Sequence, residues 1–142
     1  MILGIDISTS ITGFAIVAEG EIVFYDSVDL RKYKNLFEKT ERIKEALFNI
    51  FDNYQFCRED DHWMEIDQDN ENKIKQAGIK VPRGQKAKQV VLQYLLDNEP
   101  AFKIEYTKHG NPKPESYDRA DAIIVAKAGW AIEQSSSEED TE

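Results

Sequence analysis

Three short apolar stretches open the chain, and polar or small residues typical of turns separate them. Residues 2–7 read ILGIDI, which is apolar at almost every position and predicts a strand that is buried on both faces. The hydroxyl-rich segment 8–10 (STS) predicts one turn, and 19–20 (EG) predicts a second. We therefore expect three strands that form an antiparallel meander, at about 2–7, 12–18 and 21–28.

Apolar residues at helical spacing follow further along the chain. A helix over about 35–51 is predicted by Leu36, Ile43, Leu47 and Ile50. The stretches VVLQYLL and ADAIIVAKAG predict two more helices, at about 85–97 and 116–133. Between the first and second helices, the cluster 62–66 (HWMEI) is the one part of the acidic segment 52–72 that could form a strand.

This mixture of strands and helices indicates one α/β domain. A chain of 142 residues is long enough to bury roughly 70% of the surface that its unfolded form exposes. We expect the domain to span residues 1–133. The closing segment 134–142 is rich in serine and acids and is expected to be a disordered acidic tail.

Several simple features bear on where the protein resides. No apolar run is long enough to span a membrane. The N-terminus lacks the basic start and the cleavage site of a signal peptide. The single cysteine, Cys57, cannot form an internal disulfide, as is usual in a reducing cytosol. We therefore expect a cytoplasmic protein that has no membrane partner.

Charge is distributed unevenly around a net value of −9. Residues 51–72 carry eight acids and one base, whereas residues 73–113 carry nine Lys or Arg against three acids. An acidic protein binds polyanions poorly as a whole, but a local excess of six positive charges can form a surface that faces phosphates. The alternative is a solvated basic face, and charge alone leaves both interpretations open.

Three aspartates stand out against their apolar surroundings. Asp6 interrupts the first strand, where burying a carboxylate is costly unless a partner such as a metal ion compensates it. Asp118 and Asp121 are three residues apart, so a helix projects both from one face. Acids near a helix start also gain from the helix dipole, which is the simpler explanation. Convergence of all three would instead suit a divalent cation, which prefers oxygen ligands.

Three segments resemble motifs of one known family. GIDISTSITGFAIV is similar to the first motif of the RuvC-like Holliday junction resolvases, within the ribonuclease H-like nuclease superfamily, and YDRADAIIVAKAGW is similar to their last motif. IKQAGIKVPRGQKAKQVV resembles the family segment in which a lysine-rich strand end leads through a glycine turn into a helix. The motifs occur in the family's order. The resemblance implies a ribonuclease H-like mixed sheet, flanked by helices, that begins with the antiparallel meander.

The resemblance also implies a function and a set of site residues. Asp6, Asp118 and Asp121 match the catalytic metal ligands for Mg²⁺ or Mn²⁺, and water activated by the metal would be the nucleophile. Contacts with the nucleic acid are implied for Ser8, Thr9, Lys80, Arg83, Lys86 and Lys88. The family acts as homodimers that nick branched DNA in recombination and repair, and it occurs in bacteria and viruses.

One part of the family pattern is abbreviated in this chain. The family carries a further catalytic and metal-binding glutamate on its fourth strand, and Glu65 in HWMEID is the candidate. A helix and a fifth strand should follow, yet only residues 67–73 separate this cluster from the lysine-rich segment. We therefore expect a fold that lacks one strand and one helix, where a partner protein could cover the shortened sheet. The alternative is that residues 52–72 are an acidic replacement for the middle of the family fold.

This abbreviation leaves a second function open. The chain could be a catalytically degenerate homologue that binds DNA or a protein without cleaving. A third interpretation, the actin-like and sugar-kinase superfamily, shares the glycine–hydrophobic–aspartate strand with a hydroxyl turn. That superfamily needs two domains and a second glycine-rich phosphate loop, and this chain offers neither.

Overall fold

The computed structural model describes residues 1–54, 62–65 and 78–140, with the backbone alone for 62–65 and 135–140. Along the chain, the elements are β1 (Ile2–Asp6), β2 (Ile11–Ala18), β3 (Glu21–Asp29), α1 (Leu36–Asn53), β4 (His62–Glu65), α3 (Ala87–Asn98) and α4 (Glu115–Asp140). The protein is therefore α/β, as the sequence predicts.

The strands form one mixed sheet in the order β3-β2-β1-β4. β1 pairs with β2 and β2 pairs with β3, both antiparallel, which confirms the predicted meander. β4 lies parallel to β1 on its other side. Since β1 and β2 are the two central strands, almost all of their residues are buried.

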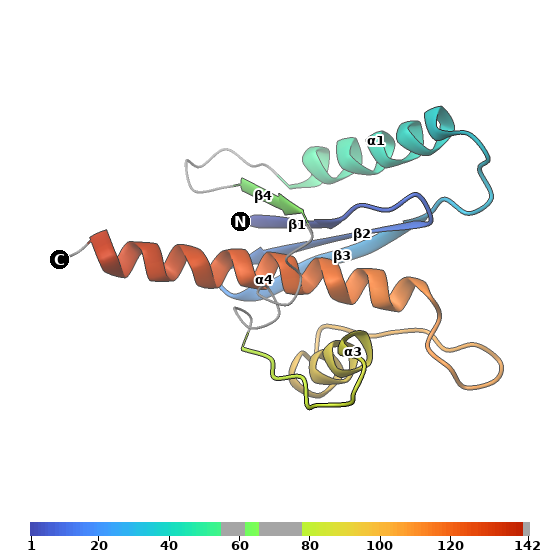
Figure 1. The fold of residues 1–142 in the computed structure, drawn as a ribbon. Coiled ribbons are helices and arrows are strands. Elements are labelled where there is room, and N and C mark those ends of the chain that lie inside the picture. The colour runs from blue at the N-terminus through green and yellow to red at the C-terminus, as the bar shows by residue number, and fades with distance from the viewer. Residues whose placement is uncertain (55–61, 66–77, 141–142) are drawn as a thin grey trace.

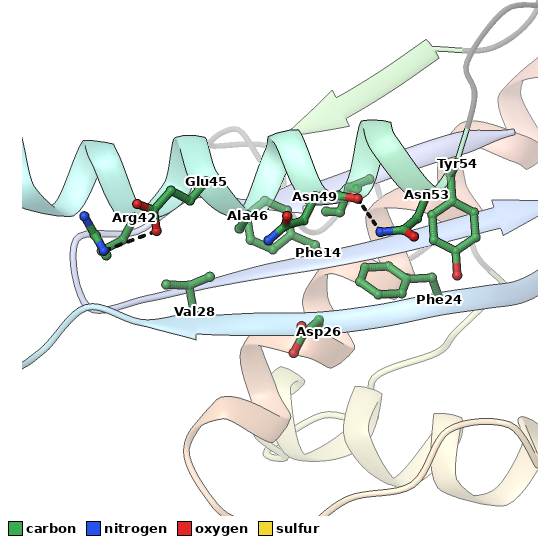
Figure 2. Close-up of a pocket in the computed structure, with 11 residues that line it drawn as sticks. Phe14, Phe24, Asp26, Val28, Arg42, Glu45, Ala46, Asn49, Asn53 and Tyr54 are labelled. Carbon is green, nitrogen blue, oxygen red and sulfur yellow. Dashed lines mark hydrogen bonds and ion pairs between the residues drawn. The ribbon is translucent and has the colours of Figure 1, made fainter.

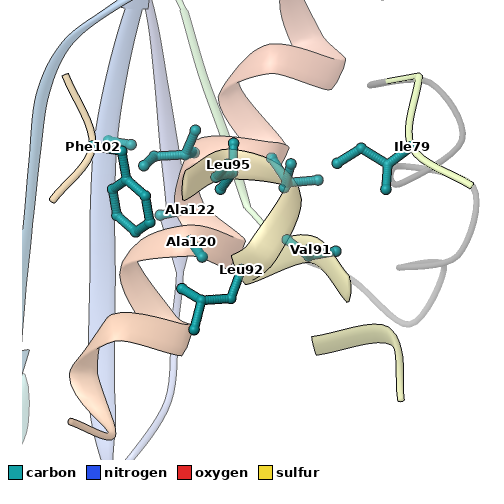
Figure 3. Close-up of a cluster of buried hydrophobic side chains, with 10 residues drawn as sticks. Ile79, Val91, Leu92, Leu95, Phe102, Ala120 and Ala122 are labelled. Carbon is teal, nitrogen blue, oxygen red and sulfur yellow. The ribbon is translucent and has the colours of Figure 1, made fainter. Parts of the chain in front are cut away.

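Helices cover both faces of the sheet. α4 crosses one face and α1 lies over the other, while α3 packs on the outer side of α4 (Figure 1). Side chains of the central strands point alternately to the two faces of the sheet. On one face, Leu3, Ile5, Phe14 and Ile16 pack with Ile50 of α1. On the other face, Ile2 and Val17 pack with Ala126 of α4. The core between α3 and α4 is shown in Figure 3 and includes Val91, Leu92, Leu95, Phe102, Ala120 and Ala122.

Two glycines of the sheet let the backbone of α4 approach unusually closely. A Cβ atom added at Gly13 would lie 2.1 Å from the carbonyl oxygen of Asp118, and one added at Gly4 would lie 2.2 Å from that of Ala122. Neither distance is sterically possible, so any side chain at these positions would push the helix away. The first turns of α4 are thereby held directly against β1 and β2.

α1 is packed more loosely than α4. The helix begins at Leu36 because the side chain of Asn35 accepts a hydrogen bond from the backbone N–H of Glu38 at 2.8 Å. Ile50 is its one fully buried residue, and Phe37 remains 75% exposed. A groove of about 620 Å³ separates the helix from β2 and β3, as Figure 2 shows, and aromatic and polar side chains line it.

The structure corrects one boundary and leaves others outside the described residues. α4 continues to Asp140, so residues 134–140, predicted to follow the helix as a tail, are helical. Most of the acidic segment 52–72 lies outside the described residues, as does the stretch 66–77 on which the expected loss of a strand and a helix depends. None of the described helices has the length and hydrophobicity of a membrane span.

Candidate active site

Three acidic side chains lie near one another where β1 ends and α4 begins. Asp6 is the last residue of β1 and pairs across the sheet with Gly13 of β2. Because the backbone of Asp118 rests on Gly13, the side chains of Asp6 and Asp118 come within hydrogen-bonding reach of each other. Asp121 follows on the next turn of α4, and its charge also acts on Asp6. The two glycine contacts thus determine the position of the acid pair over the strand.

Burial and mutual repulsion raise the pKa values of these acids. The pKa of Asp6 rises from 3.8 to about 7 because of burial first, and then because of the charges of Asp121 and Asp118. Burial and the charge of Asp118 likewise raise the pKa of Asp121 to about 7. Burial raises the pKa of Asp118 too, although a hydrogen bond with Asp6 opposes the rise. The interaction between the two side chains thus raises the pKa of Asp6 and opposes the rise of the Asp118 pKa.

The donor set has the chemistry that a divalent cation requires. Mg²⁺ and Mn²⁺ bind carboxylate oxygens, and a cation would remove the repulsion that now raises the pKa values. In the present conformation, however, no three described His, Cys, Asp or Glu side chains are grouped so that they could hold a metal ion. Asp6, Asp118 and Asp121 therefore lie near one another without being arranged around an ion in this structure.

The backbone of Glu65 lies next to this site. Parallel pairing of β4 with β1 sets Glu65 opposite Ile5, which immediately precedes Asp6. Glu65 thus occupies the carboxyl end of the neighbouring strand, as the predicted fourth-strand glutamate should. Its carboxylate lies outside the described side chains, so its role as a ligand stays a prediction.

The turn after β1 is held by a residue that sequence reasoning missed. Thr12 is completely buried. Its hydroxyl donates to the Ser8 carbonyl oxygen at 2.9 Å and accepts from the Ser8 N–H at 3.2 Å. The Ser8 hydroxyl in turn accepts from the Ser10 N–H at 3.0 Å, while Thr9 is exposed. A hydroxyl residue within the apolar strand that follows the turn was the available signal for Thr12.

The predicted nucleic-acid contacts divide into two groups. Lys80, Arg83 and Lys86 are exposed before α3, where Lys80 and Lys86 line a surface depression of about 690 Å³. Lys88 lies nearer the carboxylates. Its positive charge therefore opposes the rise in the pKa of Asp121. Its ammonium group also lies 4.9 Å from the centre of the Tyr117 ring.

Two further cations, one that acts on Asp118 and one at the turn after β1, were not predicted. The charge of Arg31 lowers the pKa of Asp118, against the effect of burial. Lys39 donates from Nζ to the carbonyl oxygen of Thr9 at 2.7 Å, within the turn beside Asp6. Both come from the end of β3 and the start of α1, far from the lysine-rich segment in the sequence, so their proximity depends on the tertiary fold.

Comparisons of the chain with protein-family models, with curated proteins and with solved structures returned no match.

Proposed function

We propose that the protein is a magnesium- or manganese-dependent endonuclease that cleaves branched DNA, with a ribonuclease H-like fold. The observation that carries the proposal is the meeting of Asp6 from β1 with Asp118 and Asp121 from α4, all with raised pKa values. Three acids that repel one another while partly buried are costly to the fold. A functional requirement for a bound cation explains why the chain retains them.

The chain's own residues divide the remaining work. Asp6, Asp118 and Asp121 would hold the ion, with Glu65 as a further ligand. When bound, the ion supplies an activated water and stabilises the charge on the leaving oxygen. Lys80, Arg83, Lys86 and Lys88 would contact the DNA backbone, since phosphate contacts position the substrate. The hydroxyls of Ser8 and Thr9 would lie beside the phosphate that is cleaved.

The choice of branched DNA rests on the three motifs that resemble the RuvC-like resolvases. The mixed sheet that begins with an antiparallel meander supports this choice. With it we propose a homodimer that makes paired nicks and a cytoplasmic location in a bacterium or an infected cell. A partner protein that covers the shortened sheet belongs to the same proposal.

A second candidate function is DNA binding without cleavage. It is favoured by the absence, among the described residues, of a group of three acids already arranged around an ion site. Loss of one ligand would impair catalysis with two metal ions more than it would impair the binding of one magnesium ion. A magnesium ion keeps several of its waters and so needs few protein ligands.

Cleavage of a labelled four-way DNA junction tests both candidates. The wild type is incubated with Mg²⁺ or Mn²⁺ and compared with Asp118→Asn and with the control Asp52→Asn, which changes an exposed acid of α1. We expect paired nicks from the wild type and from the control variant, and none from Asp118→Asn. Junction binding without any nick would support the non-cleaving candidate. Neither binding nor cleavage would contradict both.

A further inference from the structure

A second pair of cations lies at the β1–β2 turn, which follows Asp6. It consists of Arg31, which follows β3, and Lys39 in the first turns of α1; we call it the turn-side basic pair. Lys88, by contrast, comes from α3, and α1 and α3 lie on opposite faces of the sheet (Figure 1). The carboxylate site is therefore flanked by cations from two separate parts of the fold.

Lys39 is held in place by a hydrogen bond to a neutral group, and this contact does not neutralise its positive charge. Its ammonium group donates to the Thr9 carbonyl oxygen at 2.7 Å, which is a neutral acceptor. An ammonium group has three donors, so two remain for another ligand. This contact fixes the charge of Lys39 at the turn that carries Ser8 and Thr9.

Arg31 is oriented by its neighbours. The backbone N–H of Leu30 donates to the Ser10 carbonyl oxygen at 2.7 Å, which joins the end of β3 to the same turn. The Arg31 guanidinium then binds Asp29 through Nε at 2.9 Å and Nη2 at 2.7 Å. The positive charge of Arg31 still acts on Asp118, whose pKa it lowers. The side chain nevertheless remains 54% exposed.

We propose that the turn-side basic pair binds a backbone phosphate of the nucleic acid, on the far side of the carboxylates from Lys88. This inference rests on the proposed function, because it assigns the path that a DNA strand takes across that site. Lys39 contributes most, since Asp29 partly neutralises Arg31. A substrate that touches both flanks must span the carboxylate site, as a DNA strand of several nucleotides does.

Binding of a fluorescent four-way DNA junction across a series of salt concentrations, in EDTA, tests the inference. Lys39→Gln should weaken binding several-fold and reduce the slope of log K against log salt by about 1, the effect of losing one phosphate contact. Lys39→Arg should preserve the slope. The matched control Lys44→Gln removes an exposed charge elsewhere on α1 and should change neither quantity. Asp29→Asn should strengthen binding, because it frees the Arg31 charge.

The outcomes separate this inference from the proposed function. If the wild type binds the junction but Lys39→Gln behaves like Lys44→Gln, the turn-side basic pair does not contact phosphate and the inference is wrong. If Lys39→Arg loses as much slope as Lys39→Gln, the effect is not one of charge, and the inference is equally wrong. If the wild type binds no DNA, the proposed function itself fails and the inference fails with it.

Discussion

Replacing Asp121 by asparagine should stabilise the metal-free protein at alkaline pH, although it removes a residue of the candidate active site. Asparagine has the shape of a protonated aspartate but cannot ionise. The wild-type carboxyl must lose its proton in a buried position beside Asp118 as the pH rises. The variant avoids that ionisation and also removes one of the charges that raise the pKa of Asp6.

The size of the effect follows from the pKa. At 1.36 kcal/mol per pKa unit, the rise of Asp121 from 3.8 to about 7 corresponds to about 4 kcal/mol. Below pH 3.8 the carboxyl is protonated in both folded and unfolded chains, so its contribution to stability is fully present. As the pH rises toward 7 the unfolded chain ionises first, and stability falls until the folded carboxyl ionises as well. The part of this loss between pH 5 and 8 is about 2–3 kcal/mol for an isolated carboxyl, and exchange of protons among the three acids should reduce what is observed to about 2 kcal/mol.

Urea unfolding in EDTA at pH 5, 6, 7 and 8 measures this loss directly. The free energy of unfolding of the wild type should decrease over the series, and that of Asp121→Asn should decrease less, by about 2 kcal/mol at pH 8 relative to pH 5. Asp52→Asn, at an exposed site, should follow the wild type. Parallel curves for wild type and Asp121→Asn would refute the reasoning, because the carboxyl would then have an ordinary pKa.

Three further changes test other parts of the account. Gly13→Ala should lower the free energy of unfolding by about 1–3 kcal/mol, because its Cβ would lie 2.1 Å from the Asp118 carbonyl oxygen; an unchanged urea midpoint would show that α4 does not rest on this strand. Thr12→Val should cost about 2 kcal/mol, measured by the same unfolding, since the Ser8 N–H and carbonyl oxygen lose their buried partner; a neutral result would mean that the turn is held by other contacts. Lys88→Gln should extend the pH-dependent loss of metal-free stability to higher pH and make it larger, because the ammonium group lowers the pKa of Asp121 in the folded chain; a smaller loss that ends at lower pH would contradict this placement of Lys88.

The elements that sequence predicted well are those whose signal is local. The meander followed from apolar runs separated by turn residues, and Asp118 and Asp121 followed from a three-residue spacing on one helix. Asp6 could be singled out because a lone carboxylate in a buried strand needs compensation. Even so, the end of α4 was placed too early, since composition alone indicated a tail where the helix continues.

Features that depend on packing could not be read from the pattern. Gly4 and Gly13 look like ordinary strand glycines until α4 is seen to cross them. Arg31 and Lys39 lie in the first 50 residues, whose eight acids and six bases give no net positive charge. They come together at the β1–β2 turn because the end of β3 and the start of α1 meet it.

The central claim is that Asp6, Asp118 and Asp121 form a divalent-metal site, and calorimetric titration of metal-free protein with Mn²⁺ tests it most directly. Because these carboxyls hold protons, binding at pH 6 should release protons into the buffer, and binding at pH 8 should release fewer. Asp118→Asn should abolish this binding, and Asp52→Asn should retain it. Absence of saturable binding, or equal binding by both variants, would contradict the claim.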